Sequence, residues 1–81
     1  MEKRLGVVGI VVEDNSVSDE INNLLHQYSG IIAGRMGLPY KERGVSVISL
    51  IVDGTVDEIS AMTGKLGKLK GVFVKSAIAK G

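Results

Sequence analysis

The chain of 81 residues contains no cysteine, so it forms no disulfide and offers no thiolate to zinc, copper or an iron–sulfur cluster. It has a single histidine, His26, which argues against a transition-metal site built from protein ligands alone. We therefore expect no metal and no cofactor. A domain this short buries a modest core and usually needs a disulfide, a metal or a partner subunit. Because disulfides and metals are excluded, a partner subunit is the remaining option, and we expect the chain to associate with itself.

Long apolar runs and an excess of charge are also missing. No run approaches the roughly 20 residues of a membrane-spanning helix. The apolar stretch after Lys3 and Arg4 is broken by Gly6 and Gly9, unlike a secretory signal. Ten basic residues balance nine acidic ones, which gives no electrostatic reason to expect nucleic acid. We expect one cytoplasmic domain over residues 1–81, without a membrane or direct nucleic-acid partner.

Hydrophobic periodicity predicts six elements of secondary structure. Apolar residues on both faces of two segments are typical of central strands, whereas Gly34, Arg35 and Gly37 indicate an edge strand. Thr55 and Glu58 form the pattern of a capping box at the start of a helix. The predicted elements are a strand at 4–12, a helix capped by Ser16 and ended by Gly30, strands at 31–38 and 45–52, a helix after Thr55, and a strand at 72–79. Residues 39–44 are the predicted connection between the two middle strands.

This order, βαββαβ, predicts an α+β, ferredoxin-like domain. Each strand–helix–strand half forms a right-handed crossover, giving a four-stranded antiparallel sheet with both helices on one face. The central strands are apolar on both faces, yet the helices cover only one. An exposed apolar face usually marks an interaction surface, so we expect a homo-oligomer packed through the open sheet face or its edges.

Catalytic signals are absent. An RNA-recognition motif needs aromatic residues on its central strands, and these strands have none. No nucleophile and base occur in a recognisable pattern. Glu13 and Asp14, a candidate acid–base pair, are more typical of a turn with solvated carboxylates. We therefore expect a protein that is not an enzyme.

Two segments are candidates for ligand binding. In the turn of Asp14, Asn15 and Ser16, free backbone N–H groups at a helix start could hold an anion, or simply cap the helix. In the second segment, Arg35 between glycines supplies a planar donor fork, with Tyr40 following shortly after. Alternatively, the charge of Arg35 serves only to keep the exposed edge strand from pairing with a strand of another chain.

The whole chain resembles a known family. Residues 32–40, with the run Gly-Arg-Met-Gly-Leu-Pro, residues 46–53 and residues 63–67 are similar to the small regulators of the iron-only hydrogenase system. The resemblance implies an ACT-like fold, related to the C-terminal domain of nickel-responsive repressors, together with self-association and a regulatory role. Two departures matter. The turn after the first strand lacks the Pro and Gly of amino-acid-binding ACT domains, and His26 alone does not reproduce a nickel site.

Two hypotheses for function follow. In the first, a dimer or tetramer binds a small anionic or amino-acid-like ligand between subunits. The Asp14–Ser16 turn of one subunit and Arg35 of another, with Tyr40, would contact it. In the alternative, the chain is an interaction module without a small ligand, which docks a hydrogenase-maturation or regulatory protein through the open sheet face or the Gly34–Tyr40 segment.

Overall fold

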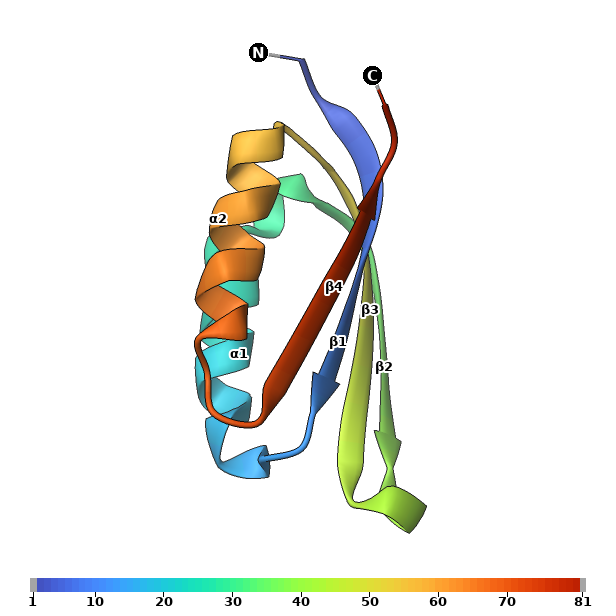
Figure 1. Ribbon diagram of the computed structural model, residues 1–81, viewed down its shortest axis with the longest axis vertical. Coiled ribbons are helices and arrows are strands. Elements are labelled where there is room, and N and C mark those ends of the chain that lie inside the picture. The colour runs from blue at the N-terminus through green and yellow to red at the C-terminus, as the bar shows by residue number, and fades with distance from the viewer. Residues whose placement is uncertain (1, 81) are drawn as a thin grey trace.

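A computed structural model describes residues 2–80 of the chain as one sheet with two helices on one side (Figure 1). The strand order is β2-β3-β1-β4, and every neighbouring pair is antiparallel. The predicted βαββαβ fold, the two central strands and the edge position of the second strand are confirmed. The elements are β1 (Arg4–Val12), α1 (Ser18–Gln27), β2 (Ile32–Tyr40), β3 (Val45–Gly54), α2 (Val56–Gly67) and β4 (Val72–Ile78).

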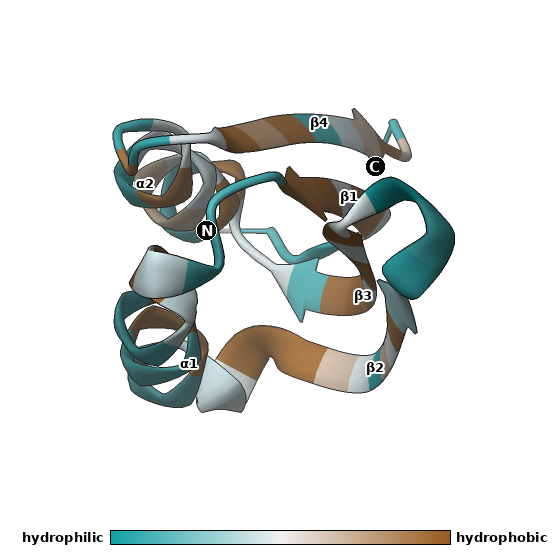
Figure 2. Ribbon diagram, turned by 90° about the horizontal axis from the view of Figure 1, so that it is seen from below, coloured by the Kyte–Doolittle hydropathy of each residue, from teal (hydrophilic) through white to brown (hydrophobic). Residues whose placement is uncertain are grey.

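The core lies between the sheet and the two helices. Alternate residues of β1 and β3 point toward the helices, because successive strand side chains take opposite faces. Helix side chains at the 3.6-residue period close the core from the other side. Figure 2, viewed from one end, shows both helices on that face, with α1 near β2 and α2 near β4. The buried residues include Val8, Ile10 and Val12 of β1, Ile48, Leu50 and Val52 of β3, Ile21 and Leu25 of α1, and Ile59, Met62 and Leu66 of α2.

The opposite face of the sheet carries no helix. Residues paired across antiparallel strands share a face, so the register places one continuous apolar row across all four strands. This row, which we call the apolar row, consists of Leu38, Val47, Val11 and Phe73. Its members are between 36% and 58% exposed, and Ile51, further along the open face of β3, is 53% exposed. The prediction of a bare apolar face is therefore confirmed.

The first helix begins and ends differently from the prediction. The capping side chain is Asp14, which accepts a hydrogen bond from the Ser16 amide and starts a 3₁₀ turn, Asn15–Val17. The predicted cap at Ser16 is wrong because the short Asp14 carboxylate reaches this amide two residues ahead, as in an Asx turn. The helix also ends at Gln27 rather than Gly30, which lies in a second 3₁₀ turn, Ser29–Ile31.

The second strand is longer than predicted. Pro39 and Tyr40 belong to β2 and pair with Ser46 and Val45, so the connection shrinks to the 3₁₀ turn Lys41–Arg43 and Gly44. Proline has no N–H to donate, but an edge strand needs only one side of its backbone for pairing. The capping box of α2 is confirmed: Thr55 and Glu58 each bond the other's backbone N–H. Neither of the two α-helices in residues 2–80 has the length and hydropathy that a membrane span requires.

Candidate functional site

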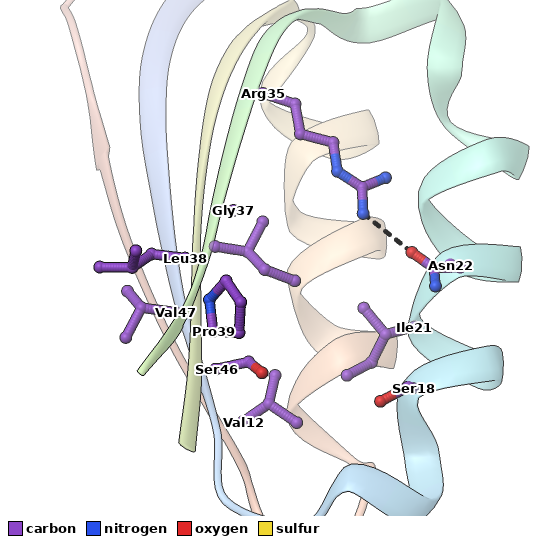
Figure 3. A pocket seen from close by; sticks show the side chains of 11 residues that line it. Val12, Ser18, Ile21, Asn22, Arg35, Gly37, Leu38, Pro39, Ser46 and Val47 are labelled. Carbon is purple, nitrogen blue, oxygen red and sulfur yellow. Dashed lines mark hydrogen bonds between the residues drawn. The ribbon is translucent and has the colours of Figure 1, made fainter. Parts of the chain in front are cut away.

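Arg35 lies on the side of β2 that faces the helices. It pairs with Leu50, whose side chain is fully buried on that side. The Arg35 side chain crosses to α1, where its Nη2 donates a hydrogen bond to Asn22 Oδ1 at 2.8 Å (Figure 3). A neutral amide oxygen thus holds a permanently charged guanidinium, which keeps most of its donors available.

Beside this pair a cleft of about 300 Å³ opens between α1 and the strands β2 and β3. Arg35 is the only charged residue that lines it, and no acidic residue does. Figure 3 shows Val12, Ile21 and Pro39 on the α1 side of the strands, with Leu38 and Val47 on the other side. The lining residues are Val12, Ser18, Ile21, Asn22, Arg35, Gly37, Leu38, Pro39, Ser46, Val47 and Ile48.

The cleft exists because the residues that could fill it are small. Gly37 pairs with Ile48 and therefore faces the helices, between Arg35 and Pro39 along β2. A Cβ built on Gly37 would meet no atom within 4 Å. On the helix, Ser18 contributes only a hydroxymethyl group at the nearest turn. The edge strand and the helix are consequently separated by a cleft at this point, next to the Arg35–Asn22 hydrogen bond.

A second hollow of about 310 Å³ lies on the other side of the Arg35–Asn22 pair. His26 also lines it, and no acidic residue does. Ser18, Asn22 and His26 are spaced four residues apart on α1, so they form one polar stripe facing β2. Sequence reasoning included Gly37 in the segment around Arg35 but missed Ser18 and Asn22, although the i, i+4, i+8 spacing of the polar residues of α1 could have indicated the stripe.

The Asp14–Ser16 turn lies at a different place. Both the amide and the hydroxyl of Ser16 donate to Asp14 Oδ1, at 3.0 and 2.6 Å. The Ser16 hydroxyl bond, followed by the backbone bond, lowers the pKa of the Asp14 carboxyl. Asp14 lies against Gly71 at the start of β4, at the opposite margin of the sheet from β2. An anion at this turn would compete with the Asp14 carboxylate for the Ser16 amide.

Tyr40 points away from Arg35. It pairs with Val45 on the open face of the sheet, whereas Arg35 faces the helices. The five residues predicted to bind ligand, Asp14, Asn15, Ser16, Arg35 and Tyr40, therefore lie at three separate places within one protomer. Only a second copy of the chain could bring them together.

Metal-binding chemistry has no visible support in the part of the chain that the structure describes. No three His, Cys, Asp or Glu side chains of residues 2–80 lie close enough together to hold an ion. The exposed His26 shares its hollow with Arg35, whose positive charge disfavours a cation there.

Several solved structures resemble this chain. It is 38% identical to TM1266 from Thermotoga maritima, with a TM-score of 0.93, and the match covers 98% of this chain and 100% of that one. It is 23% identical to the ACT domain of a GTP pyrophosphokinase from Chlorobium tepidum, with a TM-score of 0.78, covering 93% and 99%. A nitrogen regulatory PII-like protein from Thiomonas intermedia K12 matches at 13% identity and a TM-score of 0.53, covering 99% and 100%. A search of the curated proteins found no match.

A family model described as "TM1266-like: Iron-only hydrogenase system regulator, putative" matches residues 4–76, nearly the whole domain. This match and the 38% identity to TM1266 agree with the run of glycines around Arg35 that first indicated the family. The ACT neighbours agree with the strand order and the one-sided helices. The chain belongs to the TM1266-like family of iron-only hydrogenase system regulators and has an ACT-like fold.

Proposed function

We propose that this protein is a cytoplasmic, non-catalytic regulator that works as a homo-oligomer and binds a small anionic or amino-acid-like ligand between its subunits. Membership of the regulator family supports the regulatory role. The observation that carries the assembly is the apolar row, which crosses the whole open face of the sheet.

The open face has the composition of a surface that becomes buried. Across the described strands, only Asp53 and Lys75 bring charge to this face, and they have opposite signs. Burying the apolar row against a second sheet would stabilise the assembly by about 25 cal/mol per Å² of apolar area removed from water. A chain of 81 residues has little core to spare, so this contribution is large relative to its own stability.

Ligand binding is supported by the state of Arg35. Its guanidinium bonds a neutral amide and faces a cleft without an acidic residue. An incoming carboxylate would give the guanidinium a full counter-charge, and a two-bond pair of opposite charges is stronger than a single bond to an uncharged amide. In the assembled protein, the Asp14–Ser16 turn and Tyr40 of neighbouring copies would complete the surroundings of the ligand.

The assembly is tested with two variants that each place a carboxylate on a comparable exposed valine. Val11 in the apolar row is 36% exposed and Val56 at the start of α2 is 39% exposed. Native mass spectrometry and light scattering should find the parent protein and Val56→Glu as the same dimer or tetramer. Val11→Glu should be a folded monomer, because two glutamates would face each other's apolar row.

Two outcomes would contradict the assembly. A parent protein that is monomeric at tens of micromolar would show that the open face does not join copies of this chain. An oligomer that survives Val11→Glu would place the contact elsewhere. A folded monomer that co-purifies with a stoichiometric second protein would favour the alternative, an interaction module that docks a hydrogenase-maturation or regulatory protein on the same face.

A further inference from the structure

We infer that the ligand of the Arg35 cleft is a monocarboxylate with a short apolar body, neither a free amino acid nor a phosphate compound. This inference rests on the proposed function, since it names the chemical class of the ligand that contacts Arg35. It also places the carboxylate-binding part of that intersubunit site in the cleft between α1 and the edge strand β2.

The charge of the cleft selects a single negative group. Arg35 is its only charged lining residue, and a guanidinium matches a carboxylate through two parallel N–H···O bonds. The Asn22 amide, now bonded to Arg35, lies where it can donate to the same carboxylate once the guanidinium turns to the ligand. One end of the ligand is thereby specified.

The opposite end of the cleft selects an apolar group. Along β2 the helix-facing positions run from Arg35 over Gly37 to Pro39, a span of roughly 13 Å at the rise of an extended strand. Over this length the walls are formed by Ile21, Ile48 and Val12, all buried side chains that offer no hydrogen bond. A hydrocarbon body lying over Gly37 would rest on these apolar side chains and against the exposed Pro39.

The same lining argues against an amino acid. The ammonium of a zwitterion needs a carboxylate or several acceptors when it leaves water, and none of the eleven lining residues is acidic. The cleft offers only the hydroxyls of Ser18 and Ser46 and the amide of Asn22 as side-chain acceptors. The ammonium would therefore weaken binding relative to the same skeleton without it.

A phosphate compound fits no better. Protein sites for phosphate combine several cations with clusters of backbone N–H groups, usually at a helix start. Here there is one arginine, and the Ser16 amide before α1 is already bonded to Asp14. The volume, about 300 Å³, also stands at the lower limit of small-molecule pockets, which suits a body of a few carbons.

The test is a titration followed by ¹H–¹⁵N NMR on the full chain with four probes. These are 4-methylpentanoate, L-leucine (the same skeleton with an ammonium), 4-methylpentanamide (the same skeleton without charge) and inorganic phosphate. We expect saturable binding of 4-methylpentanoate, with shifts at Asn22, Arg35 and Gly37, and a Kd about tenfold or more lower than for the other three. Propanoate and butanoate should bind more weakly, by about fourfold per missing methylene.

Two pairs of variants locate the site. Arg35→Gln should weaken binding about tenfold or more, whereas Arg43→Gln, which removes the same charge from the turn after β2, should not. Gly37→Val should abolish saturable binding by filling the cleft, because its Cβ meets open space. Gly34→Val is its control, since Gly34 lies on the same strand but pairs with Ile51 on the open face.

Several results would overturn the inference. Leucine or phosphate binding as tightly as 4-methylpentanoate would reject the ligand class, and an unchanged Kd in Gly37→Val would reject the cleft. An absence of saturable binding by 4-methylpentanoate, propanoate and butanoate would reject both the ligand class and the cleft. The oligomeric state of the same samples, measured separately, reports on the proposed assembly, so an intact oligomer that ignores carboxylates refutes only this inference.

Discussion

Gly71 and Asp14 lie so close that the position just before β4 admits no side chain. A Cβ on Gly71 would stand 2.7 Å from the Asp14 Cβ and 3.1 Å from the Asp14 nitrogen. The neighbouring Glu13 amide donates to the Gly71 carbonyl at 2.7 Å, which ties the end of β1 to the turn before β4. Gly71 also has a φ of 70°, in the left-handed region that favours glycine.

Two glycine substitutions separate these effects. Gly44 has a φ of 68° but open space around its Cβ. Gly44→Ala should lower the free energy of unfolding by about 1 kcal/mol, the cost of a left-handed alanine. Gly71→Ala should lower it by about 2–4 kcal/mol, because the contact with Asp14 adds to that cost. Urea denaturation followed by circular dichroism measures both, and equal losses would show that the Asp14 contact relaxes freely.

Leu50 and Ile51 are neighbours in β3 with opposite surroundings. Leu50 is fully buried against the helices, whereas Ile51 lies on the open face. In protein diluted to monomers, Leu50→Ala should lower the free energy of unfolding by about 3 kcal/mol, through lost burial and a cavity. Ile51→Ala should cost under about 1 kcal/mol there. A comparable loss at Ile51 in the monomer would mean that the open face is not open to water.

The capping box of α2 should contribute to stability through Thr55. Its hydroxyl accepts from the Glu58 amide at 3.1 Å, which satisfies one of the free N–H groups of the helix start. Thr55→Ala should lower the free energy of unfolding by about 1 kcal/mol, and Thr55→Ser should restore most of it. Chemical denaturation of the three proteins is the measurement. Equal loss in Ser and Ala variants would assign the effect to the threonine methyl group instead.

Stability should fall in acid in a way that depends on Glu58. Its carboxylate accepts from the Thr55 amide and hydroxyl, and these bonds, the backbone one first, hold its pKa below the usual 4.5. Because this pKa is lowered in the folded state, the contribution of the ionised Glu58 to the free energy of unfolding is complete above pH 4.5. It is lost as the pH falls through the folded-state value.

Glu58→Gln should therefore flatten the loss of stability below pH 4.5, measured as melting temperature against pH. Asp57→Gln, in the same helical turn, serves as the control. If both variants leave the acid limb of the profile unchanged, the capping bond does not govern it. Asp14 should contribute with the same sign, because its bonds to Ser16 also lower its pKa.

The elements that the sequence predicted well are those decided by local chemistry. The capping box of Thr55 and Glu58 needs only residues of one turn, and it formed as expected. The two central strands were recognisable because both their faces are apolar, which also predicted the bare sheet face. Where two neighbouring residues could each cap the helix start, as Asp14 and Ser16 could, the prediction chose the wrong one, because Asp14 accepts from the Ser16 amide.

The candidate site was predicted only in part. The glycines around Arg35 singled this residue out, and they indicated the family to which the chain belongs. Its partner Asn22 lies 13 positions earlier on a different element, and no local pattern joins the two. Arg35 and Tyr40 are five positions apart in one strand and therefore take opposite faces; the register of β2 on β3, which one residue of slip would reverse, decides which of them faces the helices.

By itself, the sequence determined the order of the elements, the edge position of β2 and the apolar character of both sheet faces. These follow from composition and period, which act over a few residues. Only the tertiary structure decided that Arg35 meets Asn22, that Gly37 leaves a cleft beside them, and that Leu38, Val47, Val11 and Phe73 align in one row. Those relationships depend on strand register and on the space left between helix and sheet, and both are set when distant segments pack.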